Sequence, residues 1–267
     1  MSNDYVLGVN QAELDRLEFQ HSVWKKVTDD FISRCGLSRG MKCLDAGCGP
    51  GFVSMDLLEI IGAEGELTAL EPSEKYLQHF KNYCEAKKIA NVKFVNGTAE
   101  EAELPENYFD FIYARWVICF VPDPELFLSK LYKALKPGGM IALQDYNYAG
   151  ITRHPQTELF KKVPSIMEDY FREGGGDINI AARVPELYKK VGLQITDFNP
   201  VCLAGDKNSG VFEWAHRFFS VHFQVMADKG VISQQDAEEL HKDWMDNRYL
   251  DNSFFFSPLV VDMAGRK

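Results

Sequence analysis

Short apolar runs of strand length alternate with amphipathic segments of helical period between residues 41 and 145. Alternation at this interval is typical of parallel strands joined by right-handed helical crossovers. It therefore predicts an α/β fold with a Rossmann-like, doubly wound sheet. The expected elements are, in order, Met41–Asp45, Phe52–Ile61, Glu66–Leu70, a helix capped by Ser73, Val92–Val95, Phe109–Tyr113, Pro124–Leu135 and Met140–Leu143.

Helix and strand signals continue on both sides of this core. Leu17, Trp24 and Phe31 lie at helical spacing, so an N-terminal helix is expected. Further strands at 194–198 and 257–263 are expected to complete a mostly parallel seven-stranded sheet. The predicted organisation is one domain with an N-terminal helical cap 1–40, an α/β core 41–145, and a C-terminal part 146–267 that carries helical cap insertions at about 146–180 and 205–250.

The C-terminal part also contains the run Gly174-Gly175-Gly176. Consecutive glycines lower the cost of backbone rearrangement, because no Cβ restricts the chain. We therefore expect a mobile joint here that responds to ligand binding.

Charge and hydropathy limit the partners and the location of the protein. The chain has 29 Lys and Arg residues against 39 Asp and Glu residues, a formal net charge of −10. An acidic surface repels phosphate backbones, so nucleic acid is not expected as a partner. No run approaches the roughly 18 consecutive apolar residues of a membrane span, and residues 1–10 lack the features of a signal peptide. With scattered cysteines, these features predict a cytoplasmic protein.

A glycine-rich loop follows the first expected strand of the sheet. Asp45-Ala46-Gly47-Cys48-Gly49-Pro50-Gly51 leads directly into the next helix, at the sheet edge where doubly wound folds bind ligands. Glu71 follows about twenty residues after Gly51, where a carboxylate accepts both hydroxyl protons of a ribose. The loop and this carboxylate together indicate a cofactor that contains a nucleoside.

The spacing of the glycines bears on which cofactor is bound. A dinucleotide fingerprint has the form G-x-G-x-x-G, whereas Phe52 stands where its third glycine would be. A Walker A sequence is absent as well. The loop by itself remains compatible with a tight turn of purely structural importance.

The motifs occur in the order seen in a known family. Leu44-Asp45-Ala46-Gly47-Cys48-Gly49-Pro50-Gly51, Leu70-Glu71-Pro72-Ser73, Gly97-Thr98-Ala99-Glu100, Val121-Pro122-Asp123-Pro124 and Leu135-Lys136-Pro137-Gly138-Gly139 resemble motifs of class I S-adenosylmethionine-dependent methyltransferases. The branch that contains ubiquinone and menaquinone C-methyltransferases looks most similar. The resemblance covers about residues 40–145, with a weaker similarity near Tyr5 and Gln20.

This resemblance implies that S-adenosylmethionine is the cofactor and S-adenosylhomocysteine the product. It implies that the glycine loop holds the methionine end, that Glu71 binds the ribose, and that Thr98 and Ala99 meet the adenine. Relatives usually carry Asp where Thr98 stands. The cofactor-binding residues expected in this way are Tyr5, Gln20, Asp45, Gly47, Gly49, Gly51, Glu71, Pro72, Thr98, Ala99, Glu100 and Arg115.

The methyl acceptor is expected to be a small molecule. Tyr146 directly follows the fifth expected strand and has the best geometric claim to face the acceptor, and His154 is the other catalytic candidate. Aromatic residues in the expected cap favour a planar or apolar acceptor. No metal is expected, because no cluster of His and Cys has ligand spacing.

Two rival functions remain open at this point. One is a protein that binds S-adenosylmethionine or S-adenosylhomocysteine without catalysis. The other is a nicotinamide-dependent oxidoreductase built on a similar sheet.

Overall fold

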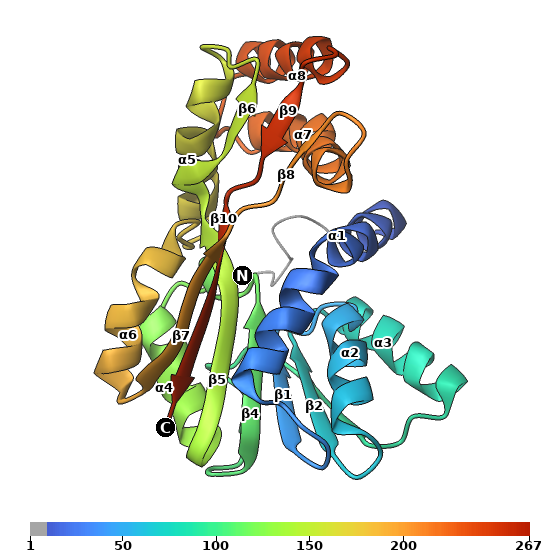
Figure 1. The fold of residues 1–267 in the computed structure, drawn as a ribbon, viewed down its shortest axis with the longest axis vertical. Helices are drawn as coiled ribbons and strands as arrows, with labels where there is room; N and C mark the ends of the chain where they lie inside the picture. Colours follow the sequence, from blue (N-terminus) through green and yellow to red (C-terminus); the bar gives the residue numbers. More distant parts are fainter. Residues whose placement is uncertain (1–9) are drawn as a thin grey trace.

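The computed structural model describes residues 10–267, which form a seven-stranded sheet with helices on both faces (Figure 1). The strand order is β3-β2-β1-β4-β5-β10-β7, and only β10 runs antiparallel to its neighbours β5 and β7. This is the predicted doubly wound, mostly parallel α/β sheet. The strands are β1 (Lys42–Ala46), β2 (Glu66–Glu71), β3 (Val92–Asn96), β4 (Phe109–Arg115), β5 (Leu135–Asn147), β6 (Thr152–His154), β7 (Gln194–Val201), β8 (Ala204–Asp206), β9 (Phe254–Phe256) and β10 (Leu259–Arg266).

The helices begin and end at residues whose chemistry suits those positions. Ser73 and Ser209 are N-caps whose side chains accept backbone N–H groups of the first turn, and Gly36 and Gly192 end helices in the left-handed conformation. The α-helices are α1 (Gln11–Cys35), α2 (Phe52–Ile61), α3 (Glu74–Lys87), α4 (Pro124–Ala134), α5 (Val163–Glu173), α6 (Val184–Val191), α7 (Gly210–Asp228) and α8 (Gln234–Arg248).

Apolar side chains fill both faces of the sheet. Phe31 of α1, Leu57 of α2 and Phe80 of α3 belong to one buried cluster. Leu128 of α4 and Tyr188 of α6 belong to another, larger cluster. The helices α1, α2 and α3 therefore cover one face and α4 and α6 the other, which leaves the edge at the carboxyl ends of the parallel strands free for a site (Figure 1).

A cap lies beyond that edge. The sequence predicts a helical cap, whereas the structure contains strands as well as helices there. The helices α5, α7 and α8 surround a three-stranded antiparallel sheet in the order β6-β9-β8 (Figure 1). Trp244 of α8 packs against Phe160, Phe219 and Phe255 in the middle of the cap. The strands β6, β8 and β9 have three residues each, which is too short for an alternating pattern to be recognised in the sequence.

The fifth strand of the sheet begins earlier than expected. The sequence predicts a helix up to Leu135 and a strand from Met140, whereas β5 starts at Leu135 and includes the segment between them. Pairing with β4 shifts between Phe109 and Phe111, and Gly138 adopts a positive φ of 81° within this irregular stretch. The glycines thus serve a bulge at the start of the strand, which a sequence pattern does not distinguish from a loop.

The triple-glycine segment lies against the turn that follows β4. The N–H of Asp177 donates to the carbonyl of Cys119 at 2.9 Å, and a Cβ on Gly176 would collide with that same carbonyl oxygen. Glycine is therefore required at position 176 for close approach of two backbones. In residues 10–267, no helix has both the length and the hydropathy needed to cross a membrane.

Candidate functional site

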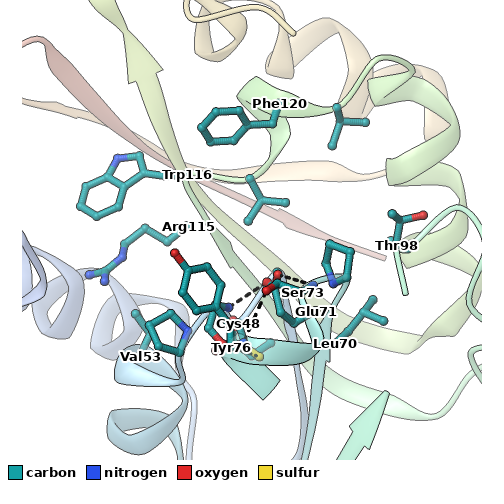
Figure 2. Close-up of a pocket in the computed structure, with 18 of the residues that line it drawn as sticks. Cys48, Val53, Leu70, Glu71, Ser73, Tyr76, Thr98, Arg115, Trp116 and Phe120 are labelled. Carbon is teal, nitrogen blue, oxygen red and sulfur yellow. Dashed lines mark hydrogen bonds between the residues drawn. The ribbon is translucent and has the colours of Figure 1, made fainter. Parts of the chain in front are cut away.

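A cavity of about 400 Å³ opens at the carboxyl ends of β1, β2 and β4 (Figure 2). Its walls come from the loop after β1, the ends of β2 and β4, the segment Gly97–Glu100, and α1. These segments are far apart in the sequence, and the parallel arrangement brings their ends together. The cavity occupies the position at which doubly wound folds bind nucleoside ligands.

The glycine loop is shaped by positive φ angles and by close packing. Gly47 has φ 81°, and a Cβ there would collide with the side chain of Val117. Gly49 has φ 53°, and a Cβ there would meet no protein atom within 4 Å. Gly47 is therefore required by packing, whereas Gly49 leaves backbone open to the cavity for a ligand to approach.

Glu71 is held at the end of β2 by backbone donors. Its Oε2 accepts the N–H of Gly49 at 3.0 Å, and its Oε1 accepts the N–H of Ser73 at 2.9 Å. Burial raises the pKa of this carboxyl, and the two hydrogen bonds oppose that effect. The carboxylate is thus oriented before any ligand binds, with lone pairs left for hydroxyl donors in the cavity.

Asp45 lies deeper, at the end of β1, and also lines the cavity. The hydroxyl of Ser54 donates to its Oδ2 at 2.6 Å. Burial raises the pKa of Asp45 to about 6, and the Ser54 hydrogen bond and the Arg115 charge partly counter this. The carboxylate is therefore mostly ionised at neutral pH and gains a proton in mildly acidic solution.

Arg115, at the end of β4, brings a positive charge to the cavity wall. Its guanidinium donates to Thr28 Oγ1 at 2.9 Å and to His21 Nδ1 at 3.2 Å. Burial, with the charges of Arg115 and Lys25, lowers the pKa of His21 to about 3, so its neutral ring can accept this hydrogen bond. Among the described residues, no carboxylate lies within ion-pair distance of Arg115, although the charges of Asp45 and Asp56 act on it from farther away.

Most of the residues predicted for cofactor binding meet in this one cavity. Gln20, Asp45, Gly47, Gly49, Glu71, Pro72, Thr98, Ala99, Glu100 and Arg115 all line it. Two others do not. Gly51 is the N-cap of α2 and packs against Phe80, and Tyr5 lies outside the described residues.

The two catalytic candidates lie in different places. Tyr146 lies on the wall of a second, smaller cavity of about 50 Å³ between the sheet and the cap. His154 is exposed on β6, opposite Phe254, and lines neither cavity. The structure therefore does not bring His154 together with the other predicted site residues.

Several residues that line the larger cavity are not among the expected cofactor-binding residues. Leu17 and Tyr76 come from α1 and α3, and Trp116 and Val117 from the turn after β4. The position of Trp116 directly after a strand was the available signal, because the ends of parallel strands face the ligand site. Tyr76 gave no signal, since its helical spacing is equally typical of a core residue.

The chain matches the family model described as "Methyltransferase domain" over residues 37–201. This range contains the glycine loop, Glu71 and Arg115. The chain belongs to this methyltransferase domain family. The family agrees with the resemblance seen in the motifs.

Curated relatives share this domain. The chain is 33% identical over 153 residues to a protein of Staphylococcus aureus (strain MRSA252) named demethylmenaquinone methyltransferase. The match covers 57% of this chain and 58% of that relative. The similarity thus spans just over half of the relative's length.

Solved structures share the fold at low sequence identity. A protein from Bacillus halodurans superimposes with a TM-score of 0.62 at 16% identity, covering 90% of this chain and 97% of that one. Phosphoethanolamine N-methyltransferase 2 of Haemonchus contortus, solved with S-adenosyl-L-methionine, gives 0.58 at 21% identity, covering 89% of this chain and 51% of that one. These likenesses support the α/β fold.

Metal ligands do not gather at the site. Among residues 10–267, no group of three or more His, Cys, Asp or Glu side chains is arranged to hold a metal ion. The charged groups at the cavity are instead Asp45, Glu71, Glu100 and Arg115.

Proposed function

We propose that this protein is a methyltransferase that uses S-adenosylmethionine to methylate a small molecule. The observation that carries the proposal is that Glu71, the open glycine loop and Arg115 all line one cavity. A carboxylate for ribose hydroxyls, open backbone at Gly49 and a cation for a carboxylate match the parts of this cofactor. Membership of the methyltransferase domain family supports the same conclusion.

Each of these residues fits one part of the cofactor. Glu71 would accept the ribose hydroxyl protons, Arg115 would pair with the amino-acid carboxylate, and Thr98 with Ala99 would contact the adenine. When bound, S-adenosylmethionine would supply a methyl group whose carbon accepts an electron pair from the acceptor. The carbon–sulfur bond breaks, and its electrons stay on the sulfur of S-adenosylhomocysteine. Any proton on the attacking atom is released to solvent.

The chain contributes mainly by positioning and by excluding water. Trp116, Val117 and Phe120 form an apolar wall of the larger cavity, and Gly174 lies on the same wall. Holding donor and acceptor in line in such a site lowers the barrier by at most about 7–11 kcal/mol. No His or Lys lines either cavity in the described part of the chain, so an acceptor with a readily ionised or unprotonated atom suits the site.

The acceptor we propose is a planar ring, such as that of a quinol. The smaller cavity adjoins the larger one through Gln20, Trp116 and Phe120, which line both. Its walls carry the rings of Tyr146, Tyr148, Phe171, Trp214, Phe218 and Phe219. The name of the S. aureus relative, demethylmenaquinone methyltransferase, supports a quinone-type acceptor.

A screen for release of S-adenosylhomocysteine tests this function. The protein would be incubated with S-adenosylmethionine and small acceptors, including hydroxyaromatic compounds, reduced naphthoquinones and amines, and the product measured by mass spectrometry. Product formed with an acceptor supports the proposal. Tight cofactor binding without product for any acceptor would point to a non-catalytic binding protein, and a blue-shifted fluorescence of bound NADH to an oxidoreductase.

Arg115→Gln tests the orientation of the cofactor in the cavity. We expect it to weaken binding of S-adenosylhomocysteine by about 10- to 100-fold, because a charged hydrogen-bond partner of the carboxylate is lost. Binding of 5′-methylthioadenosine, which lacks the amino-acid part, should change by less than about twofold. Calorimetry measures both, with Arg172→Gln on the surface as the control. Equal weakening of both ligands would show that Arg115 does not face the carboxylate.

A further inference from the structure

Trp116 occupies the boundary between the two cavities. It follows β4 directly and, with Gln20 and Phe120, lines both the larger and the smaller cavity. Figure 2 shows its indole nitrogen on the edge of the ring turned away from Glu71. A group at this boundary is close to a ligand in the larger cavity and to a ligand in the smaller cavity, which we call the aromatic cavity because rings line it.

The backbone of Trp116 is in an uncommon conformation. Its φ is +55°, in the left-handed region that non-glycine residues rarely adopt. The structure holds it there through a hydrogen bond from the Trp116 N–H to the carbonyl of Gln144, at 2.8 Å. Such strain of about 1–3 kcal/mol persists only where the surroundings enforce it, and it is concentrated at functional sites.

Neighbouring groups also fix the indole ring. The ring stacks on Tyr146 with centroids 5.7 Å apart and an interplanar angle of 14°. The Arg115 guanidinium carbon lies 4.5 Å from the indole centroid. The ring is therefore clamped in one orientation, with little freedom to turn its N–H toward another partner.

The indole N–H of Trp116 has no partner among residues 10–267, although it is buried. Indole nitrogen is only a donor, so it needs an acceptor with a lone pair. Leaving such a donor buried and unpaired costs about 1–3 kcal/mol. The strained backbone, the clamped ring and the unpaired donor all coincide at the boundary of the aromatic cavity.

We propose that the indole N–H of Trp116 donates a hydrogen bond to the methyl acceptor and orients it in the aromatic cavity. The proposal rests on the proposed function, and it deepens it by defining the acceptor. The acceptor is a planar ring that carries an oxygen or nitrogen lone pair next to its reacting atom. Trp116 thus selects for a ring with a polar substituent and against a purely apolar ring of the same shape.

A pair of isosteric probes separates this hydrogen bond from mere packing. Binding of 1-naphthol and of 1-methylnaphthalene to the full-length protein would be measured in the presence of saturating S-adenosylhomocysteine. Trp116→Phe keeps an aromatic ring but removes the N–H. We expect this variant to bind 1-naphthol about 3- to 10-fold more weakly, while the smaller ring affects both probes equally.

Trp24→Phe is the matched control. Trp24 also has a buried indole N–H without a partner among the described residues, and it contacts Trp116 edge-on with centroids 5.9 Å apart. Unlike Trp116, it lines neither cavity. Its substitution should leave the preference for 1-naphthol over 1-methylnaphthalene as it is in the wild-type protein.

The two hypotheses fail in different ways. Loss of the naphthol preference in Trp116→Phe alone supports the proposal, provided that both variants bind S-adenosylhomocysteine and melt as folded proteins. An unchanged preference in Trp116→Phe, or a wild-type protein that binds neither probe, overturns it. A wild-type protein that binds no S-adenosylmethionine or S-adenosylhomocysteine would instead refute the proposed function.

Discussion

At the scale of single residues, the site depends on carboxylates that backbone donors hold in place. Glu71 accepts N–H groups from Gly49 and Ser73, so the glycine loop and the segment after β2 share one anchor. Its importance goes beyond a ligand contact, because it also orders the loop that carries Gly49. The functional and structural roles of this side chain are therefore coupled.

Glu71→Ala should weaken S-adenosylmethionine binding by about 1.5–3 kcal/mol, because a charged hydrogen-bond partner of the ribose is removed. Calorimetry measures the change. Glu66→Ala is the control on the same strand, since Glu66 pairs with Lys93 away from the cavity. Unchanged affinity in Glu71→Ala would show that the ribose assignment is wrong.

Cofactor binding should also depend on pH through Asp45. Burial raises the pKa of this carboxyl to about 6, so it gains a proton as the pH falls through that value. The cofactor is positively charged at its sulfur and amino group, and it binds the ionised form better. Affinity should therefore be highest above pH 6 and decline below it. Calorimetry between pH 5 and 8 checks this, and Asp45→Asn should bind more weakly and lose the change in affinity near pH 6.

At the scale of elements, the start of α2 shows how one glycine serves packing and not binding. Gly51 is the N-cap of α2 with φ 91°, and a Cβ there would collide with the ring of Phe80 in α3. Gly51 is needed where the loop joins the helix, whereas at Gly49 the backbone borders open space in the cavity. A sequence motif merges these two requirements.

Gly51→Ala should lower the free energy of unfolding by about 1–3 kcal/mol, through backbone strain and overpacking against Phe80. Chemical denaturation measures this. Gly230→Ala is the control, because Gly230 also has a positive φ of 79° but open space around its missing side chain. If both variants lost the same stability, the collision with Phe80 would contribute nothing.

At the scale of the whole molecule, the site lies between the sheet and the cap. The triple-glycine segment connects them, since the Asp177 N–H bonds to the Cys119 carbonyl and Gly174 lines the larger cavity. A ligand in that cavity would contact the segment and the turn after β4 together. Binding would thus tie the cap more firmly to the core.

Hydrogen exchange tests this coupling. We expect the amides of residues 174–177 to exchange more slowly when S-adenosylhomocysteine is bound, because opening of the segment would break ligand contacts. The helix α8, which lines neither cavity, should be unaffected and serves as the internal control. Equal exchange of residues 174–177 with and without ligand would contradict this coupling.

The sheet and the chemistry of its first loops could be predicted from the sequence. Strand and helix periodicity predicted β1, α2 and β2 nearly to the residue, and the motifs predicted that Gly49 and Glu71 belong to one site. These features are local: each depends on a few consecutive residues at the end of a strand. Such local patterns can be read directly from consecutive residues of the sequence.

The surroundings of the smaller cavity depend on contacts between distant segments of the chain. The tertiary structure places His154 on an exposed strand of the cap and Tyr146 against Trp116. It also leaves the indole N–H of Trp116 without a partner among residues 10–267. The cap sheet itself escaped prediction because its strands have three residues each. Contacts between such distant segments depend on packing of the whole chain, which a pattern within a few consecutive residues does not encode.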